Sequence, residues 1–243
     1  MRILFIRHAE PDYSIDSLTP KGWKEAEILS HRLSKLDIKA IYCSPLGRAK
    51  DTASFTLKAL GREAEILPWL REFPCRVPRP DRDRPGAPWD LPDSYWSAHP
   101  LLLDRERWTQ DETMQGGDEV AEGVRQVWDG LDALLLRHGY KREGLLYRPL
   151  APNRDTILVF CHLGVQFVML SHLMNVATPV FWQTLCVLPS SVTTVCTQHR
   201  EKDICCFRTQ GIGDLSHLYA ENEPPSSMGF FSEVFTGDPW ALF

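Results

Sequence analysis

Short apolar runs alternate along this chain with stretches in which apolar residues recur every three or four positions. The apolar runs predict buried strands at 3–6, 38–43, 64–67, 156–161, 192–198 and 204–209. The helical spacing predicts amphipathic helices at 20–36, 45–60, 118–138 and 164–175. Alternation of this kind predicts an α/β fold, a three-layer α/β/α sandwich around a mostly parallel sheet. The last two strands can pair as a hairpin, which would give the sheet a mixed edge.

The stretch from 73 to 118 breaks this pattern. It holds seven of the eighteen prolines, together with Trp89, Tyr95, Trp96 and Trp108. Loops this long are usually functional or separately packed. We therefore expect one domain over 1–243, with an inserted lid at about 73–118 that contains short helices. A C-terminal tail at about 219–243 ends in phenylalanine and tryptophan, which we expect to pack on the body or on a second subunit.

Charged and nucleophilic side chains follow the predicted strands. Arg7 and His8 come after the first strand, and Arg48 lies in the first turn of the helix after the second. His162 follows the strand 156–161, and Glu72 follows the short third strand. Ligands of open α/β sheets bind beyond the carboxyl ends of the strands. We therefore expect these five residues to gather at one edge of the sheet.

Phosphoryl transfer is the chemistry that this set of residues suits. Arginine forks match phosphate oxygens in bidentate fashion, and a helix N-terminus adds N–H donors. A histidine that is neutral at one ring nitrogen can attack phosphorus, provided that its other N–H has an acceptor. A second histidine, if protonated, can stabilise the charged oxygens, and a carboxylic acid can protonate the leaving oxygen.

Several short motifs resemble the histidine phosphatase superfamily, the phosphoglycerate mutase-like family. Arg7-His8-Ala9-Glu10 is similar to its Arg-His-Gly signature, and Leu18-Thr19-Pro20-Lys21-Gly22 to the Leu-Thr-x-x-Gly segment that follows. The run 44–53 resembles its Ser-x-x-x-Arg-Ala-x-x-Thr-Ala segment. Cys161-His162-Leu163-Gly164 resembles the second-histidine segment, and 213–218 resembles a late segment of the family.

The resemblance implies a role for each site residue. It implies that His8 is the nucleophile that becomes phosphohistidine, and that Glu72 is the proton donor. Arg7, Arg48 and His162 then complete the phosphate pocket, with His162 also catalytic. The family needs no metal or other cofactor, and the sequence shows no metal-ligand cluster. The expected activity is therefore metal-independent hydrolysis of phosphate monoesters, of the histidine acid phosphatase type, on a small phosphorylated metabolite.

Two other functions stay open. One is a phosphoglycerate mutase or another phosphotransferase, in which the lid would exclude water. Ala9 and Leu163 stand where glycine is usual in the family, and Ser14 stands where many mutase-like members carry asparagine, which weighs against this alternative. The other is a non-catalytic module that binds phosphorylated ligands in a retained pocket.

Composition and charge narrow the partners and the compartment. Charged residues make up 24% of the chain and the net charge is −5, which disfavours nucleic-acid binding. The seven cysteines are odd in number and several lie in apolar runs, as is typical of a reducing compartment. No apolar run reaches the ~18 residues that span a bilayer. The apolar run at the N-terminus is also shorter than the hydrophobic region of a signal peptide. We expect a cytoplasmic protein without membrane association, and a homodimer stays open.

Overall fold

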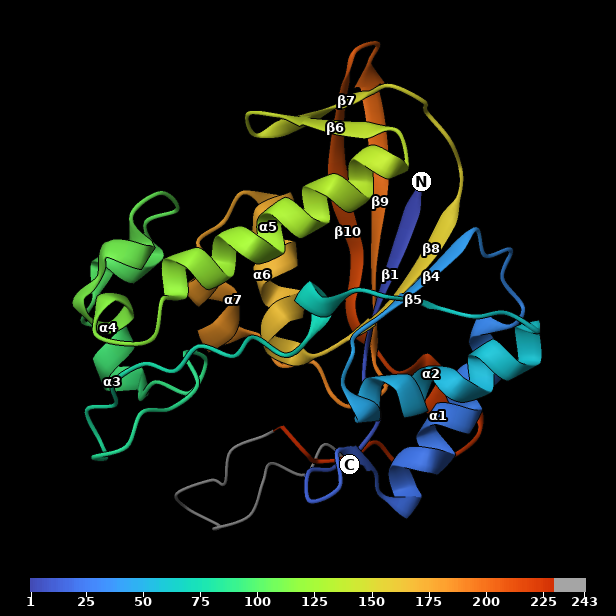
Figure 1. The fold of residues 1–243 in the computed structure, drawn as a ribbon, viewed down its shortest axis with the longest axis horizontal. Coiled ribbons are helices and arrows are strands. Elements are labelled where there is room, and N and C mark those ends of the chain that lie inside the picture. Colours follow the sequence, from blue (N-terminus) through green and yellow to red (C-terminus); the bar gives the residue numbers. More distant parts are fainter. Residues whose placement is uncertain (230–243) are drawn as a thin grey trace.

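An eight-stranded sheet forms the centre of the computed structural model, which describes residues 1–229 (Figure 1). Four neighbouring strands are parallel, in the order β5 (Glu65–Ile66), β4 (Ala40–Cys43), β8 (Thr156–Cys161) and β1 (Arg2–Arg7). The sheet continues with four antiparallel strands, β9 (Val192–Glu201), β10 (Ile204–Asp214), β7 (Leu146–Pro149) and β6 (Tyr140–Glu143). The predicted mixed sheet is confirmed, including the β9–β10 hairpin.

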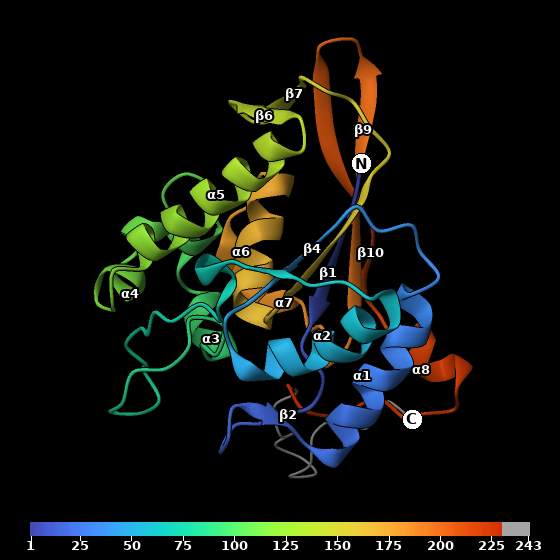
Figure 2. The same cartoon turned by 45° about the vertical axis from the view of Figure 1, so that its right-hand side comes forward.

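Helices cover both faces of the sheet because its strands are apolar on both faces. In β1, Ile3 and Phe5 belong to the core on one face, whereas Leu4 and Ile6 belong to the core on the other. The first face is covered by α5 (Val120–Arg137) and α6 (Leu163–Met174), and the second by α1 (Pro20–Leu33) and α2 (Gly47–Leu60). Figure 2 shows the two helical layers on opposite sides of the strands, as the three-layer sandwich predicts.

The ends of the first two helices follow from local side chains. Thr19 begins α1 by accepting a hydrogen bond from the Gly22 N–H at 3.0 Å. Gly61 ends α2 in the left-handed conformation, with φ of 60°. The start of α2 lies two residues beyond the predicted start at residue 45, and Ser44 does not cap the helix. The helix begins at Gly47 after Leu46, and Ser44 binds His162 instead.

The lid, residues 73–118, contains four short helices. They are α3 (Asp93–Trp96), α4 (Glu112–Gln115) and two 3-10 helices at Pro100–Leu103 and Trp108–Gln110. Figure 1 shows α3 and α4 beside α7 (Thr178–Thr184). Trp108 is buried and meets Trp182 of α7 edge-on, with ring centroids 5.6 Å apart. The lid thus has a small aromatic core where it meets the body.

Three elements fall outside the predicted strands and helices. They are the β6–β7 hairpin, α7 and α8 (Ser216–Ala220). The α7 helix begins Thr178-Pro179 but is only one and a half to two turns long by the usual pitch. Helices and hairpins this short leave too few periodic positions in the sequence to be recognised.

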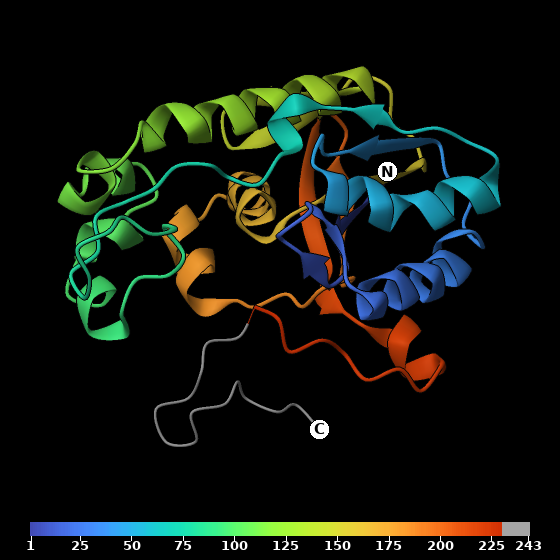
Figure 3. The ribbon, with the colours of Figure 1, turned by 60° about the horizontal axis from the view of Figure 1, so that its bottom comes forward.

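The chain runs back from α8 toward the first strand along α1 (Figure 3). We call residues 221–229 the strap. Lys21 of α1 forms an ion pair with Glu223 at 2.8 Å, and His31 contacts Glu221 at 2.7 Å. The strap ends at Gly229 beside Arg7. The predicted packing of the apolar C-terminal residues, from Phe230 to Phe243, lies outside the described residues. No helix within 1–229 is both long and apolar enough to cross a bilayer.

Candidate active site

The register of the parallel strands brings the predicted site residues together. Arg7 pairs with Cys161 across β1 and β8, and Cys43 pairs with Phe160 across β4 and β8. His8, Ser44 and His162 each follow one of these strands, so they emerge side by side at the carboxyl edge. The ring centroids of His8 and His162 are 5.1 Å apart. We call Arg7, His8, Arg48 and His162 the strand-end pocket.

The ring of His8 is held in one tautomer. Its Nδ1 lies 2.8 Å from the carbonyl oxygen of Ala9. A carbonyl can only accept, so Nδ1 carries the proton and Nε2 keeps its lone pair. Burial, followed by the positive charge of Arg7, lowers the pKa of His8 well below its ordinary value. The imidazole is therefore neutral at physiological pH. Ala9 itself adopts no left-handed conformation, so the missing family glycine causes no backbone strain.

A chain of hydrogen bonds holds the ring of His162 in place. The Leu46 N–H donates to Ser44 Oγ at 3.2 Å, and Ser44 Oγ lies 2.7 Å from His162 Nε2. The hydroxyl can donate its proton to Nε2, and in that arrangement the proton of the neutral ring lies on Nδ1. Nδ1 is buried and has no partner within residues 1–229. Burial and the neighbouring His8 lower the pKa of His162, so it offers a neutral N–H donor rather than the imidazolium that we considered.

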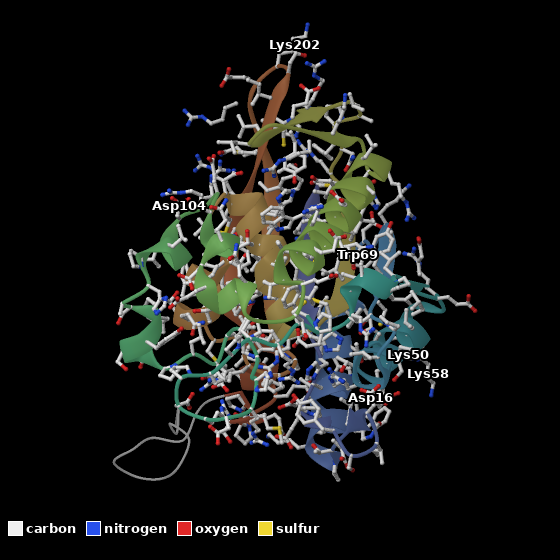
Figure 4. All side chains as sticks on the ribbon, turned by 60° about the vertical axis from the view of Figure 1, so that its left-hand side comes forward. Asp16, Lys50, Lys58, Trp69, Asp104 and Lys202 are labelled. Atoms are coloured by element: carbon white, nitrogen blue, oxygen red, sulfur yellow. The ribbon has the colours of Figure 1, made fainter. Side chains whose placement is uncertain are left out.

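Asp16 holds Arg48 and the start of α2 together. One carboxylate oxygen accepts from Arg48 Nη1 at 2.6 Å, and the other accepts from the Gly47 N–H at 2.7 Å. Asp16 has φ of 50°, and a Cβ on Gly47 would lie 2.0 Å from its carbonyl oxygen. Figure 4 shows Asp16 in the turn ahead of α1. Sequence reasoning missed this residue, because only an aspartate within a turn-like stretch marked it.

Arg7 is buried and bounded by two backbone segments. Its Nη1 donates to the carbonyl of Val187, which precedes β9. On the strap, Gly229 has φ of +109°, and a Cβ there would lie 2.7 Å from Arg7 Nη1. Only a residue without a side chain fits between the strap and this guanidinium. The Nε of Arg7 has no partner within the described chain, so a donor is available for an anion.

Glu72 lies against the N-terminus of α6. Its Oε1 accepts from the Phe73 N–H at 2.9 Å and from the Val165 N–H at 3.1 Å. Burial raises the pKa of Glu72, and these backbone donors only partly offset that effect. Gly164 makes the arrangement possible. A Cβ at that position would lie 2.3 Å from Cζ3 of Trp89 and 2.8 Å from Oε1 of Glu72, so a tryptophan of the lid borders the carboxylate.

A cavity of about 1230 Å³ opens between the strand-end pocket and the lid. Arg7, Arg48 and Glu72 line it, as does Leu163. His8 and His162 are not among the lining residues, and they are only 2% and 0% exposed. The five predicted residues thus lie at the same edge, with two arginines and the glutamate on the cavity wall and both imidazoles buried next to them. Within 1–229, no three histidine, cysteine or acidic side chains are grouped as metal ligands would be.

Comparison with known proteins finds phosphatases among both the sequence relatives and the solved structures of similar fold. A probable phosphatase from Schizosaccharomyces pombe is 26% identical over 235 residues, covering 91% of this chain and 97% of the relative. A solved phosphoserine phosphatase from Entamoeba histolytica superposes with a TM-score of 0.59 at 17% identity, covering 89% of this chain and 98% of that one. A mycobacterial glucosyl-3-phosphoglycerate phosphatase gives a TM-score of 0.59 at 19% identity, covering 87% and 98%.

These structures share the fold, and the sequence match extends over most of the chain. Residues 3–209 match the description of the histidine phosphatase superfamily, branch 1. That range includes every residue of the strand-end pocket and Glu72, and it leaves out the first two residues, the end of β10 and the segments that follow. The chain therefore belongs to the histidine phosphatase superfamily.

Proposed function

We propose that this protein is a metal-independent phosphomonoesterase that works through a phosphohistidine on His8. The observation that carries the proposal is the hydrogen bond from His8 Nδ1 to the Ala9 carbonyl, because it leaves Nε2 as an unprotonated nucleophile. The guanidiniums of Arg7 and Arg48 lie close enough to lower the pKa of His8, and the ring of His162 lies 5.1 Å from that of His8, so potential donors adjoin the nucleophile. That combination suits a phosphate and its transition state.

In the first step, Nε2 of His8 attacks phosphorus and the P–O bond to the leaving group breaks. The electron pair of that bond stays on the leaving oxygen, which takes the proton of the Glu72 carboxylic acid. A carboxyl with an ordinary pKa is almost wholly ionised at neutral pH. The raised pKa of half-buried Glu72 keeps a larger protonated fraction available for this donation.

In the second step, the Glu72 carboxylate takes a proton from water while the water oxygen attacks phosphorus. The P–N bond breaks, its electron pair returns to Nε2 of His8, and inorganic phosphate leaves. The starting protonation states of His8 and Glu72 are then restored. Because both imidazoles are buried, the cavity-lining guanidiniums or the strap residue Gly229 must shift for the phosphate to reach Nε2.

Hydrolysis is favoured over transfer to a second substrate. A mutase must keep water from its phosphohistidine, whereas the cavity of about 1230 Å³ is broad enough for water to reach Glu72. We assign the substrate to small phosphorylated metabolites. Structures of a related phosphatase from Entamoeba histolytica contain phosphoserine and 3-phosphoglyceric acid, which supports this class.

A labelling experiment tests the proposal. The protein is mixed with a ³²P-labelled aryl phosphate in the presence of EDTA, then quenched with alkali. We expect transient protein-bound label that survives alkali and is released by acid, as a phosphoramidate is. His8→Ala should lose the label and at least ~10³-fold in kcat/KM. His199→Ala, on the hairpin away from the pocket, is the matched control and should retain both.

Equal phosphate release by wild type and His8→Ala would overturn the proposal. Binding of phosphate by wild type without any turnover would instead favour the non-catalytic module. Dependence on a bisphosphorylated cosubstrate, with transfer exceeding hydrolysis, would favour the mutase.

A further inference from the structure

The cavity is much larger than a phosphate needs. Its volume of about 1230 Å³ exceeds the roughly 300–1,000 Å³ typical of small-molecule pockets. Its walls beyond the strand-end pocket carry apolar and aromatic side chains from several segments, namely Tyr13, Leu46, Phe73, Trp89, Trp182 and Leu185. A wide apolar space next to a phosphate site accommodates a bulky ester group rather than a three-carbon one.

Two arginines of the lid are already paired. Arg79 contacts Asp81 at 2.9 Å and Asp90 at 2.5 Å, and its side chain is only 4% exposed. Arg82 also pairs with Asp90. These contacts join the two arms of the lid hairpin, in which Val77 bridges to Gly86. The charge of Arg79 therefore helps to hold the lid together.

Two other arginines line the cavity without a partner. The guanidiniums of Arg71 and Arg76 make no hydrogen bond or ion pair within residues 1–229. Arg71 precedes Glu72, and its charge contributes to the lowered pKa of His162, so it lies near the phosphate end. Arg76 borders Trp89 and Asp90, on the lid side. The other acidic residue on this wall, Asp93, accepts a hydrogen bond from the Trp96 indole at 3.1 Å.

We propose that Arg71 and Arg76 form a second anion site, which selects phosphate monoesters that carry an additional negative charge on a bulky, flat apolar group. The apolar walls hold that group, and the two guanidiniums receive a carboxylate or a second phosphate. The inference rests on the proposed phosphatase activity and specifies its substrate class. Guanidiniums without partners at the border of an apolar cavity give up no protein ion pair when an anion binds, so the binding energy of the new contact is not offset by a broken one.

The test uses pairs of esters that differ only in charge. One pair is 4-carboxyphenyl and 4-carbamoylphenyl phosphate, and the other is the corresponding biphenyl pair, which reaches further from phosphorus. For wild type, we expect the carboxylate ester of at least one pair to be favoured roughly tenfold in kcat/KM. Arg71→Gln and Arg76→Gln should each reduce this preference, and the double variant should abolish it, with little change for the carbamoyl esters.

Arg84→Gln is the matched control. Arg84 is also an exposed arginine of the lid, but it does not line the cavity, so its loss should leave the preference unchanged. Equal kcat/KM for the charged and uncharged esters of both pairs in wild type would overturn the second anion site while leaving the phosphatase intact. An equal loss of preference in Arg84→Gln would also overturn it. Non-specific electrostatic attraction between the lid arginines and the anionic ester would then explain the effect. If none of the four esters is hydrolysed, the proposed function itself fails, and the inference with it.

Discussion

The strand-end pocket and the lid border the same cavity, but different interactions hold them. In the pocket, both imidazoles are fixed by a residue that follows a parallel strand, Ala9 for His8 and Ser44 for His162. The lid is fixed by aromatic contacts with Trp182 and by ion pairs at Arg79. The pocket is therefore determined by the sheet, whereas the lid depends on contacts between distant segments. Substitutions in the lid can then change substrate selectivity without changing the chemical step in the pocket.

The largest expected effect, in free energy of unfolding, concerns the buried carboxyl of Glu25. Glu25 of α1 is fully buried, accepts from the Glu10 N–H at 2.9 Å, and has no partner for Oε1 within the described residues. Burial raises the pKa of Glu25 to about 7, from 4.5. The native state therefore holds the proton more tightly than the unfolded state, so this contribution is full below pH 4.5 and is lost as pH rises through 7.

We expect Glu25→Gln to remove this pH dependence. Between pH 5 and pH 8, the unfolding free energy of wild type should fall relative to the variant by about 3 kcal/mol at most. Urea unfolding of both proteins at the two pH values measures the difference. A constant difference across this range would show that Glu25 does not titrate there.

The second effect concerns the pocket itself. In Asp16→Ala, Arg48 loses the carboxylate that orients it, and α2 loses the cap at Gly47. We expect kcat/KM to fall about 100-fold, or ~2.7 kcal/mol, because misplacing a positioning group costs about that much. Thermal unfolding should show a loss of about 1 kcal/mol from the cap. Asp12→Ala is the control, since within residues 1–229 the half-buried Asp12 carboxylate hydrogen-bonds only to Ser14. A drop in stability with unchanged kcat/KM would limit Asp16 to a structural role.

The third and smallest effect tests whether the lid contributes to chemistry. Trp89 borders the Glu72 carboxylate, so Trp89→Ala should admit water and lower the pKa of Glu72 toward its ordinary value. Protonated Glu72 is the proposed acid, so the alkaline limb of the pH–rate profile should move to lower pH. We expect about a tenfold loss of kcat/KM on an alkyl phosphate at neutral pH, with less loss on 4-nitrophenyl phosphate, whose leaving group needs no proton. Trp96→Ala is the control, and in this variant the alkaline limb of the pH–rate profile should not move.

The sequence predicts the pocket well and the cavity poorly, for physical reasons. His8 and His162 follow strands with strong apolar patterns, and parallel strands end at a common edge, so their proximity follows from the fold alone. Asp16, Trp89 and Gly164 carry no such pattern. Each acts through a contact with a residue more than 30 positions away in the sequence. Such contacts can be identified only in the folded structure. The short helix α7 was missed for the same reason, because its role is to present Trp182 to the lid.

Both backbone polar groups of His8 are hydrogen-bonded. Its N–H donates to the Cys161 carbonyl at 3.0 Å, and its carbonyl accepts from the Ser190 N–H at 3.1 Å. Such amides in the middle of a sheet open only when the whole core unfolds, whereas the irregular lid has few bonds of this kind. We expect deuterium to enter the lid amides long before that of His8. On gradual heating, the protein should therefore first stop distinguishing among esters and only later stop cleaving them.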